Sequence, residues 1–156
     1  MNRKVNGVKG FTLFELMAAV AIVTITTGMA MPRLLEQMGS AQRRSATHQF
    51  VSAHALTKAT AIRYGTVAEL HIDVSGSRYW IEVDTSYGGG VTDTVRMHDY
   101  SEESVVMASN RYLVCFDGRG LPSTAGACQA ADATVVFAES SQADTLRFTL
   151  LGQVLR

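Results

Sequence analysis

The stretch KGFTLFELMAAVAIVTITTGMAM, residues 9–31, decides the architecture of this chain. From Phe11 to Met31 it is an apolar run of 21 residues, interrupted by a single acid, Glu15. A helix of that length rises about 31 Å, which matches the hydrocarbon thickness of a bilayer. A carboxylate placed in hydrocarbon costs on the order of 3 kcal/mol, so Glu15 is by default a functional residue that needs a partner.

The charges ahead of the apolar run set its orientation. Arg3, Lys4 and Lys9 are the charged residues of the first ten, and all three are basic. The positive-inside rule therefore places residues 1–10 in the cytoplasm and exports everything after residue 32. We expect a single-pass membrane protein with its N-terminus in the cytoplasm and the bulk of the chain extracytoplasmic.

An ordinary secretory signal peptide is the plain alternative. The small residues Gly28-Met29-Ala30 would then form its cleavage site. The run is longer than the usual hydrophobic region of such a signal, and Glu15 interrupts it. No loop or helix breaker precedes Ala30 either.

A basic leader ending in Gly10 and followed by Phe-Thr-Leu-Phe-Glu-Leu, residues 11–16, resembles the class III signal of type IV pilins and type II secretion pseudopilins. The resemblance implies that a prepilin peptidase cuts after Gly10 and that the new N-terminal residue, Phe11, is methylated. It also implies a protein of the bacterial inner membrane with a periplasmic C-terminal domain, which assembles with other pilins or pseudopilins in a filament. Pro32 falls where many of these proteins carry a proline in the N-terminal helix, so it joins Glu15 as an expected assembly residue.

The chemistry of Glu15 fits that resemblance. Cleavage at Gly10 frees an α-amine on Phe11, and the Glu15 carboxylate of a neighbouring subunit can serve as its counter-ion. Pairing offsets much of the desolvation penalty, whereas an unpaired buried charge is far more costly. The alternative is a Glu15 that merely snorkels to the cytoplasmic interface, which leaves the Gly-Phe junction unexplained.

Helix signals continue beyond the apolar run to Tyr64. Apolar residues recur there at three-residue steps: Phe50, Ala53, Leu56, Ala59 and Ile62. Pro32 cannot donate to the carbonyl four residues back, so we expect a kink or local melting between Gly28 and Pro32. Basic residues outnumber acids five to one between Arg33 and Arg63, a face that is either solvated or in contact with lipid head groups or a neighbour's acids.

After Gly65 the pattern changes to a period of two, which predicts strands. Residues 70–74 and 79–83 alternate around the turn Ser75-Gly76-Ser77 and predict a hairpin. Further strands are predicted over Ser104–Met107, Arg111–Phe116, Thr134–Phe137 and Thr145–Leu151. The fold class is therefore α+β, with a long N-terminal helix packed on a small antiparallel β-sheet head. The expected segments are a cleaved leader (1–10), a transmembrane helix (11–31), its extracytoplasmic continuation (32–64) and a β-rich periplasmic head (65–156).

Two cysteines, Cys115 and Cys128, lie in the exported part. In an oxidising compartment such a pair forms a disulfide, which contributes roughly 3 kcal/mol in the chain-entropy model. Two buried thiols or a metal site are the alternatives. His98, the nearest histidine, is not at a zinc-finger spacing, and two thiolates do not complete a tetrahedral site.

The head sequence narrows the resemblance. Phe-Asp-Gly-Arg-Gly at 116–120 and a last strand running into residues 152–156 are similar to the GspH/FimT group of minor pseudopilins and minor pilins. Some FimT-type pilins bind DNA through a C-terminal Gly-Arg-x-Arg pattern. Here Gln153 stands at the first arginine position, so only Arg156 carries over. Residues 65–156 hold six basic and twelve acidic residues, and this net charge of about −6 disfavours DNA.

Catalytic, cofactor and metal motifs are weak in this chain. No G-x-S-x-G element, phosphate loop or dinucleotide fingerprint occurs. We interpret His48, His54 and His71 as solvated, and Asp99, Glu102 and Glu103 as a solvated turn rather than a calcium loop. The sequence predicts a non-enzymatic filament subunit without cofactor, catalytic residues or small-molecule substrate. We expect this filament to belong to a type II secretion system or to a type IV pilus assembly system. The alternative functions are a DNA-uptake pilin and a membrane-tethered enzyme.

Overall fold

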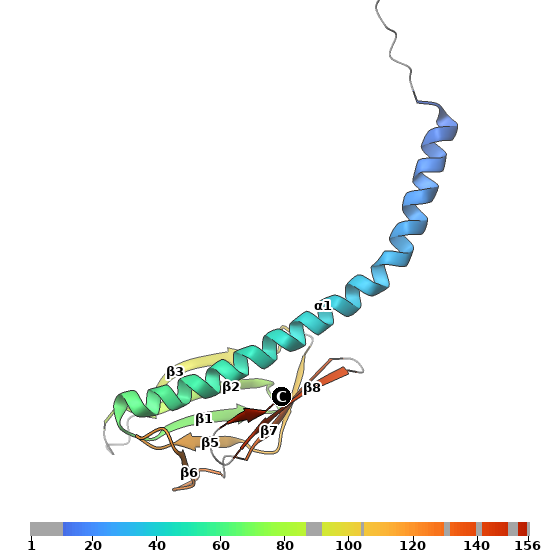
Figure 1. Ribbon diagram of the computed structural model, residues 1–156. Coiled ribbons are helices and arrows are strands. Elements are labelled where there is room, and N and C mark those ends of the chain that lie inside the picture. Colours follow the sequence, from blue (N-terminus) through green and yellow to red (C-terminus); the bar gives the residue numbers. More distant parts are fainter. Residues whose placement is uncertain are drawn as a thin grey trace, which may run out of the picture. The chain divides into compact units, whose positions relative to one another are not determined.

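The structure is a computed structural model that describes residues 11–86, 92–103, 105–129, 132–139, 142–149 and 153–155. It has one long helix followed by short strands (Figure 1). The helix is α1, Leu13–Tyr64. The strands are β1 (Ala68–Asp73), β2 (Arg78–Asp84), β3 (Thr92–Asp99), β4 (Val106–Ser109), β5 (Leu113–Phe116), β6 (Pro122–Ser123), β7 (Thr134–Glu139), β8 (Gln142–Phe148) and β9 (Val154–Leu155). The chain divides into two compact units, Met1–Met38 and Gly39–Arg156, and α1 contributes to both.

A glycine ends α1. Gly65 has a φ of +65°, a left-handed conformation that costs little only for glycine. The Thr66 amide then donates to the Ala61 carbonyl at 3.3 Å, which is the six-to-one bond of a Schellman motif. Gly118 packs against this turn so closely that a Cβ there would collide with the Gly65 backbone. The glycine of the 116–120 motif therefore has a packing role at the helix end.

The strands of the second unit form two antiparallel sheets. One sheet has the order β3-β2-β1-β5-β6 and the other β4-β7-β8-β9. The predicted hairpin is confirmed as β1 and β2, with Leu70 paired to Ile81. The sequence did not predict the partition into two sheets, because strand patterns carry no information on which strands pair.

The other predicted strands are present with shifted ends. β4 and β5 begin two residues later than predicted, at Val106 and Leu113, and β8 begins three residues earlier, at Gln142. β3 was missed altogether. It is an edge strand with nearly every side chain exposed, so it lacks the apolar alternation that marks a half-buried strand.

The core lies between the outer half of α1 and the inner faces of both sheets. Phe50 is 1% exposed, and its ring lies 5.4 Å from Tyr79 of one sheet and 5.8 Å from both Phe137 and Phe148 of the other. Cover of a sheet face by Phe50 is therefore confirmed, with Leu56 packed partly buried against the same core.

The helix predicted to continue to Tyr64 is confirmed, although not every apolar residue that indicated it packs against the core. Ala59 and Ile62 are exposed, whereas the buried face is Ala46, Thr47, Phe50, Ala53, His54, Thr57, Thr60 and Ala61. Three-residue steps turn by about 300°, so they drift around a helix of 3.6 residues per turn. The observed face mixes steps of three and four, which keeps it on one side.

Candidate functional site

The first turn of α1 contains Glu15, one of the residues that the sequence singled out. The Glu15 amide donates to the hydroxyl of Thr12 at 3.3 Å, so Thr12 caps the helix. The order Thr-x-x-Glu is that of a capping box, a signal that would have identified Thr12 from sequence. The Glu15 carboxylate lies in the first turn, where the helix dipole favours negative charge. Phe11, which precedes the cap, is 84% exposed.

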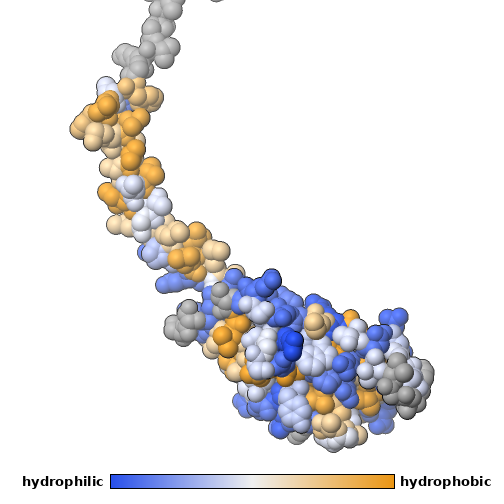
Figure 2. Space-filling view, turned by 180° about the vertical axis from the view of Figure 1, so that it is seen from behind, coloured by the Kyte–Doolittle hydropathy of each residue, from blue (hydrophilic) through white to orange (hydrophobic). Residues whose placement is uncertain are grey.

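The first unit exposes its apolar side chains throughout. Every residue from Phe11 to Met38 is exposed. Figure 2 shows this part of α1 coloured mainly as hydrophobic, whereas hydrophilic colours dominate the head. By length and composition, α1 qualifies as a candidate membrane span. Apolar surface on this scale needs a lipid or protein environment.

Hydroxyl groups in this segment are satisfied within the helix. Thr24 donates to the Val20 carbonyl at 2.9 Å, and Thr26 and Thr27 donate to carbonyls four residues back at 2.9 and 2.7 Å. Such bonds remove the cost of carrying a hydroxyl into hydrocarbon, where no water is available as a partner.

Pro32 lies inside α1, and every residue from Gly28 to Met38 is helical. Local melting between Gly28 and Pro32, one of the two expected effects of the proline, does not occur. Pro32 still lacks an amide hydrogen, so the Gly28 carbonyl has no donor from the residue four positions ahead.

The second unit begins with a polar contact between helix and sheet. Arg43 is 7% exposed and lies 3.3 Å from the Glu139 carboxylate at the end of β7. It also donates to the Gln142 side chain at the start of β8. Gly39 sits beside the same carboxylate, which a Cβ at position 39 would displace. Arg43 belongs to the basic helix face that was interpreted as solvated or in contact with lipid head groups or a neighbour's acids. It is instead buried and bonded to the sheet of its own chain.

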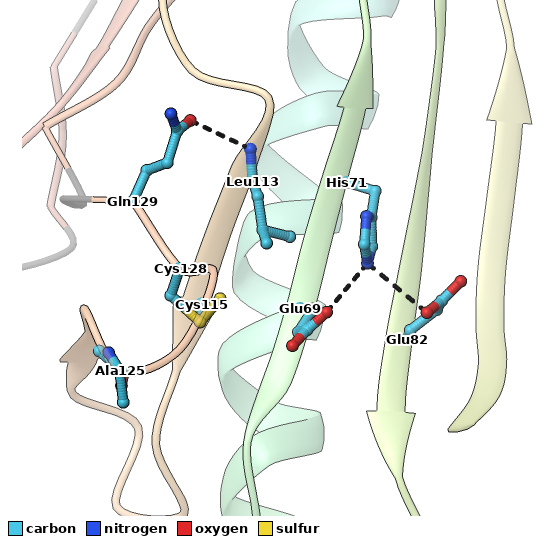
Figure 3. The surroundings of a disulfide bond; sticks show 9 residues. Glu69, His71, Glu82, Leu113, Cys115, Ala125, Cys128 and Gln129 are labelled. Carbon is cyan, nitrogen blue, oxygen red and sulfur yellow. Dashed lines mark hydrogen bonds and ion pairs between the residues drawn. A yellow bond between two sulfur atoms is a disulfide. The ribbon is translucent and has the colours of Figure 1, made fainter. Parts of the chain in front are cut away.

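Cys115 and Cys128 are bonded, as predicted, with their Cα atoms 5.6 Å apart (Figure 3). The residue after Cys128, Gln129, lies alongside β5 in a parallel bridge with Val114. Its amide donates to the Leu113 carbonyl at 3.3 Å, and its side-chain oxygen accepts a hydrogen bond from the Tyr112 amide at 2.8 Å. All four residues of β5 are buried.

His54 was interpreted as solvated, and this was wrong. It is 4% exposed, with its ring centroid 5.0 Å from Phe116 and 4.6 Å from Phe148. Burial, together with the nearby Lys58 ammonium, lowers the pKa of His54 from 6.5 to about 4. Its Nε2 has no hydrogen-bond partner within the described part of the chain. His54 is a neutral core residue, and it lies on a helix face whose burial depends on the sheets.

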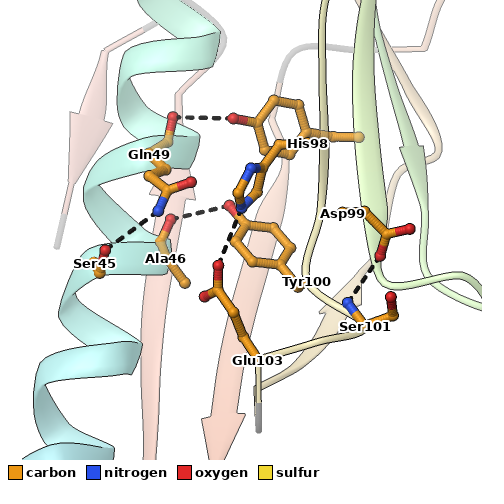
Figure 4. Close-up of polar contacts among 9 residues, drawn as sticks. Ser45, Ala46, Gln49, His98, Asp99, Tyr100, Ser101 and Glu103 are labelled. Carbon is orange, nitrogen blue, oxygen red and sulfur yellow. Dashed lines mark hydrogen bonds and ion pairs between the residues drawn. The ribbon is translucent and has the colours of Figure 1, made fainter.

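Polar side chains around β3 tie that strand to α1 and to its own turn (Figure 4). The Tyr100 hydroxyl donates to the Ala46 carbonyl at 3.2 Å. Asp99 accepts a hydrogen bond from the Ser101 amide at 2.8 Å, which lowers the pKa of Asp99. Glu103 lies 3.3 Å from His98. Asp99 and Glu103 are thus engaged in turn and strand contacts.

The predicted site residues form two separate groups. Phe11 directly precedes the capped first turn that contains Glu15, and Cys115 and Cys128 share a bond. Gly10 and Arg156 lie outside the described residues. The contacts of Arg43 and His54 were missed, because nothing in the helix sequence shows which strands will cover it.

Two kinds of comparison with known proteins gave a match, one to a family model and one to solved structures. The family described as the prokaryotic N-terminal methylation motif matches residues 5–31. Two crystal forms of the type IV minor pilin FimU of Pseudomonas aeruginosa are structurally similar. They match with TM-scores of 0.57 and 0.55 at 12% and 13% identity, over 74% and 72% of this chain and 88% and 90% of FimU. No curated protein sequence matches the chain. The chain therefore carries the methylation motif on a pilin-like fold.

Proposed function

We propose that this chain is a minor pilin or minor pseudopilin, a structural subunit of a filament assembled from the bacterial inner membrane. The observation that carries the proposal is the methylation motif, which here runs directly into an exposed apolar helix capped by Thr12. The pilin-like fold of the remainder supports it. In this role the apolar segment 11–31 anchors the subunit in the membrane before assembly and lies in the filament core afterwards. The head, residues 65–156, is exported to the periplasm.

Glu15 guides assembly in this proposal. Prepilin peptidase cuts between Gly10 and Phe11, which leaves a charged amine at the start of an apolar helix. The Glu15 carboxylate of one subunit pairs with the Phe11 amine of another, so two buried charges offset each other's desolvation. Because each helix carries one such acid in its first turn, the pair fixes the axial stagger between neighbouring helices. Methylation keeps the positive charge of the amine.

Two machines use subunits of this kind, and the likeness to a type IV minor pilin makes the type IV pilus the first one to test. Deletion of the gene should reduce surface pili if the chain serves that machine. It should reduce the export of secreted enzymes if the chain serves type II secretion. Both assays should be run on the same deletion strain and on its complemented derivative.

Processing is tested by mass spectrometry of the protein extracted from membranes. The expected N-terminus is a methylated Phe11, and substitution of Gly10 by a bulky residue should leave the leader attached, while Gly10→Ala should still be cut. An N-terminus at Met31 would instead identify an ordinary signal peptide and overturn the proposal.

Assembly is tested with Glu15→Val, and Glu36→Val serves as the matched control because Glu36 is the other acid of the exposed helical segment. Both variants should be inserted and processed, because Glu15→Val removes a costly polar group from the apolar segment 11–31 and Glu36 lies outside that segment. Only Glu15→Val should be depleted from purified filaments, because it leaves the Phe11 amine of a neighbour unpaired. Equal incorporation of the two variants would show that pairing at Glu15 does not drive assembly.

A further inference from the structure

The outer face of the β1–β2 hairpin gathers three side chains that are all metal ligands by type. Glu69 and Glu82 are directly paired across the two strands, and His71 follows two residues along β1 on the same face. The Nε2 atom of His71 lies 3.1 Å from a Glu69 oxygen and 3.5 Å from a Glu82 oxygen. Figure 3 shows both carboxylates turned toward the imidazole, and the three ligand atoms lie within 4.8 Å of one another.

Trp80 orients two of the three ligands. Its ring stacks on the His71 imidazole with centroids 4.9 Å apart and planes 4° from parallel. Its indole Nε1 donates to the Glu82 carboxylate at 2.8 Å, through the oxygen that does not face His71. Partners of this kind, which hold a ligand without binding the metal, are a regular part of metal sites.

The negative charges on this face favour the binding of a cation. Two glutamates placed directly opposite each other on neighbouring strands repel and destabilise the pairing. A groove of about 590 Å³ borders Glu69 and Glu82 and is also lined by Asp84, so a third acid adds to the negative field. Arg78, whose guanidinium carbon lies 6.0 Å from the Trp80 ring centroid, is paired with Asp73 at 2.9 Å.

The spacing of the ligand atoms indicates which cation fits. A tetrahedral zinc ion with bonds of about 2.0–2.1 Å has ligand-to-ligand edges of about 3.3–3.4 Å. The two distances from His71, 3.1 and 3.5 Å, lie on either side of that value. An imidazole with two carboxylates suits zinc and related transition metals, whereas calcium and magnesium prefer oxygen ligands alone.

We propose that Glu69, His71 and Glu82 form a binding site for a divalent transition-metal cation, represented by Zn²⁺. The three side chains are 23–35% exposed, so the ion reaches them from solvent and keeps at least one coordination position for water or an external ligand. The bound ion bridges β1 and β2 and replaces the repulsion between the glutamates with attraction to a common charge. This role is independent of filament assembly.

The test is calorimetric titration of the full chain with ZnCl₂ in detergent at pH 7.5, with no histidine tag, chelator or reductant. Reductant is omitted because free Cys115 and Cys128 thiolates would lie near Glu69 and supply extra ligands. We expect one zinc ion per chain with a Kd below about 10⁻⁴ M, and no competition from excess CaCl₂. Trp80→Phe keeps a stacking ring but removes the donor to Glu82, so it should weaken binding about 10-fold.

His71→Ala and Glu82→Gln should each lower the affinity at least tenfold, and the glutamine variant preserves the side-chain shape if the alanine variant folds poorly. His98→Ala is the matched control, because His98 is a similarly exposed strand histidine that faces one carboxylate, Glu103, at 3.3 Å. It should bind zinc as the unmodified chain does. Absence of binding, binding that survives both ligand substitutions, or equal competition by calcium would overturn the proposal and leave the three residues as an ordinary ion-pair cluster.

Discussion

The stability of the second unit, Gly39–Arg156, should fall as the pH is lowered from neutral to about 4.5, because His54 is buried in its neutral form. The folded state holds the pKa of His54 at about 4, against 6.5 for an unperturbed histidine. Between these two values the unfolded chain binds a proton that the folded chain excludes. Stability is therefore fully present above pH 6.5 and declines as the pH approaches 4.

The size of the effect follows from the two pKa values. Each pKa unit of difference between folded and unfolded states is worth about 1.4 kcal/mol, so the full loss is about 3 kcal/mol. Between pH 7.5 and 4.5 the free energy of unfolding should fall by about 2.5 kcal/mol. The carboxylates with lowered pKa values, Asp73, Asp99 and Asp117, lose their stabilising effect below their unperturbed value of 3.8, outside this window.

The assay is urea unfolding of the full chain in detergent, followed by the fluorescence of Trp80, the single tryptophan. With a urea dependence of about 1–3 kcal/mol/M, the midpoint should shift by about 1–2.5 M over this pH range. Circular dichroism should give the same midpoints, which guards against a local effect of His71 on the stacked indole.

His54→Leu removes the titrating group and should flatten the pH dependence. It should also raise stability at pH 7.5 by about 1 kcal/mol, because it removes a buried Nε2 that lacks a partner in the described structure. His48→Leu, an exposed position on the same helix, should keep the pH dependence of the unmodified chain. A pH slope that persists in His54→Leu would refute the reasoning.

Three further outcomes are expected. Reduction of the Cys115–Cys128 bond should lower the free energy of unfolding by about 3 kcal/mol, measured by urea unfolding with and without dithiothreitol, and unchanged stability would contradict the loop-closure argument. Phe50→Ala should cost about 3–5 kcal/mol because both sheets pack on that ring, whereas Ile62→Ala, at a position that is 52% exposed, should cost below about 1 kcal/mol in the same assay. The head, with its net charge of about −6, should bind duplex DNA more weakly than roughly 10⁻⁵ M at physiological salt, measured by fluorescence anisotropy; submicromolar, salt-sensitive binding that is lost in Arg156→Ala would instead indicate an uptake pilin.

The sequence by itself determined the features that depend on neighbours along the chain. Three local patterns are of this kind: the apolar run from Phe11 to Met31, its basic leader and the acid at position 15. They predicted the methylation motif that the family comparison found. The β1–β2 hairpin was also predictable, since its strands alternate around a short turn. The disulfide was predicted from the two cysteines and from the oxidising compartment expected for the part of the chain that contains both.

Only the tertiary structure decided which polar residues are buried and which of them meet. Arg43 and Glu139 are 96 residues apart in the chain, and no period in either segment links them. His54 became a core residue because strands from both sheets cover its helix face, and the helix sequence alone shows no such cover. Glu69, His71 and Glu82 converge because the hairpin register places Glu82 opposite Glu69 on the same face as His71. A one-residue shift in that register would turn the side chain of Glu82 to the other face of the sheet and separate it from the other two ligands.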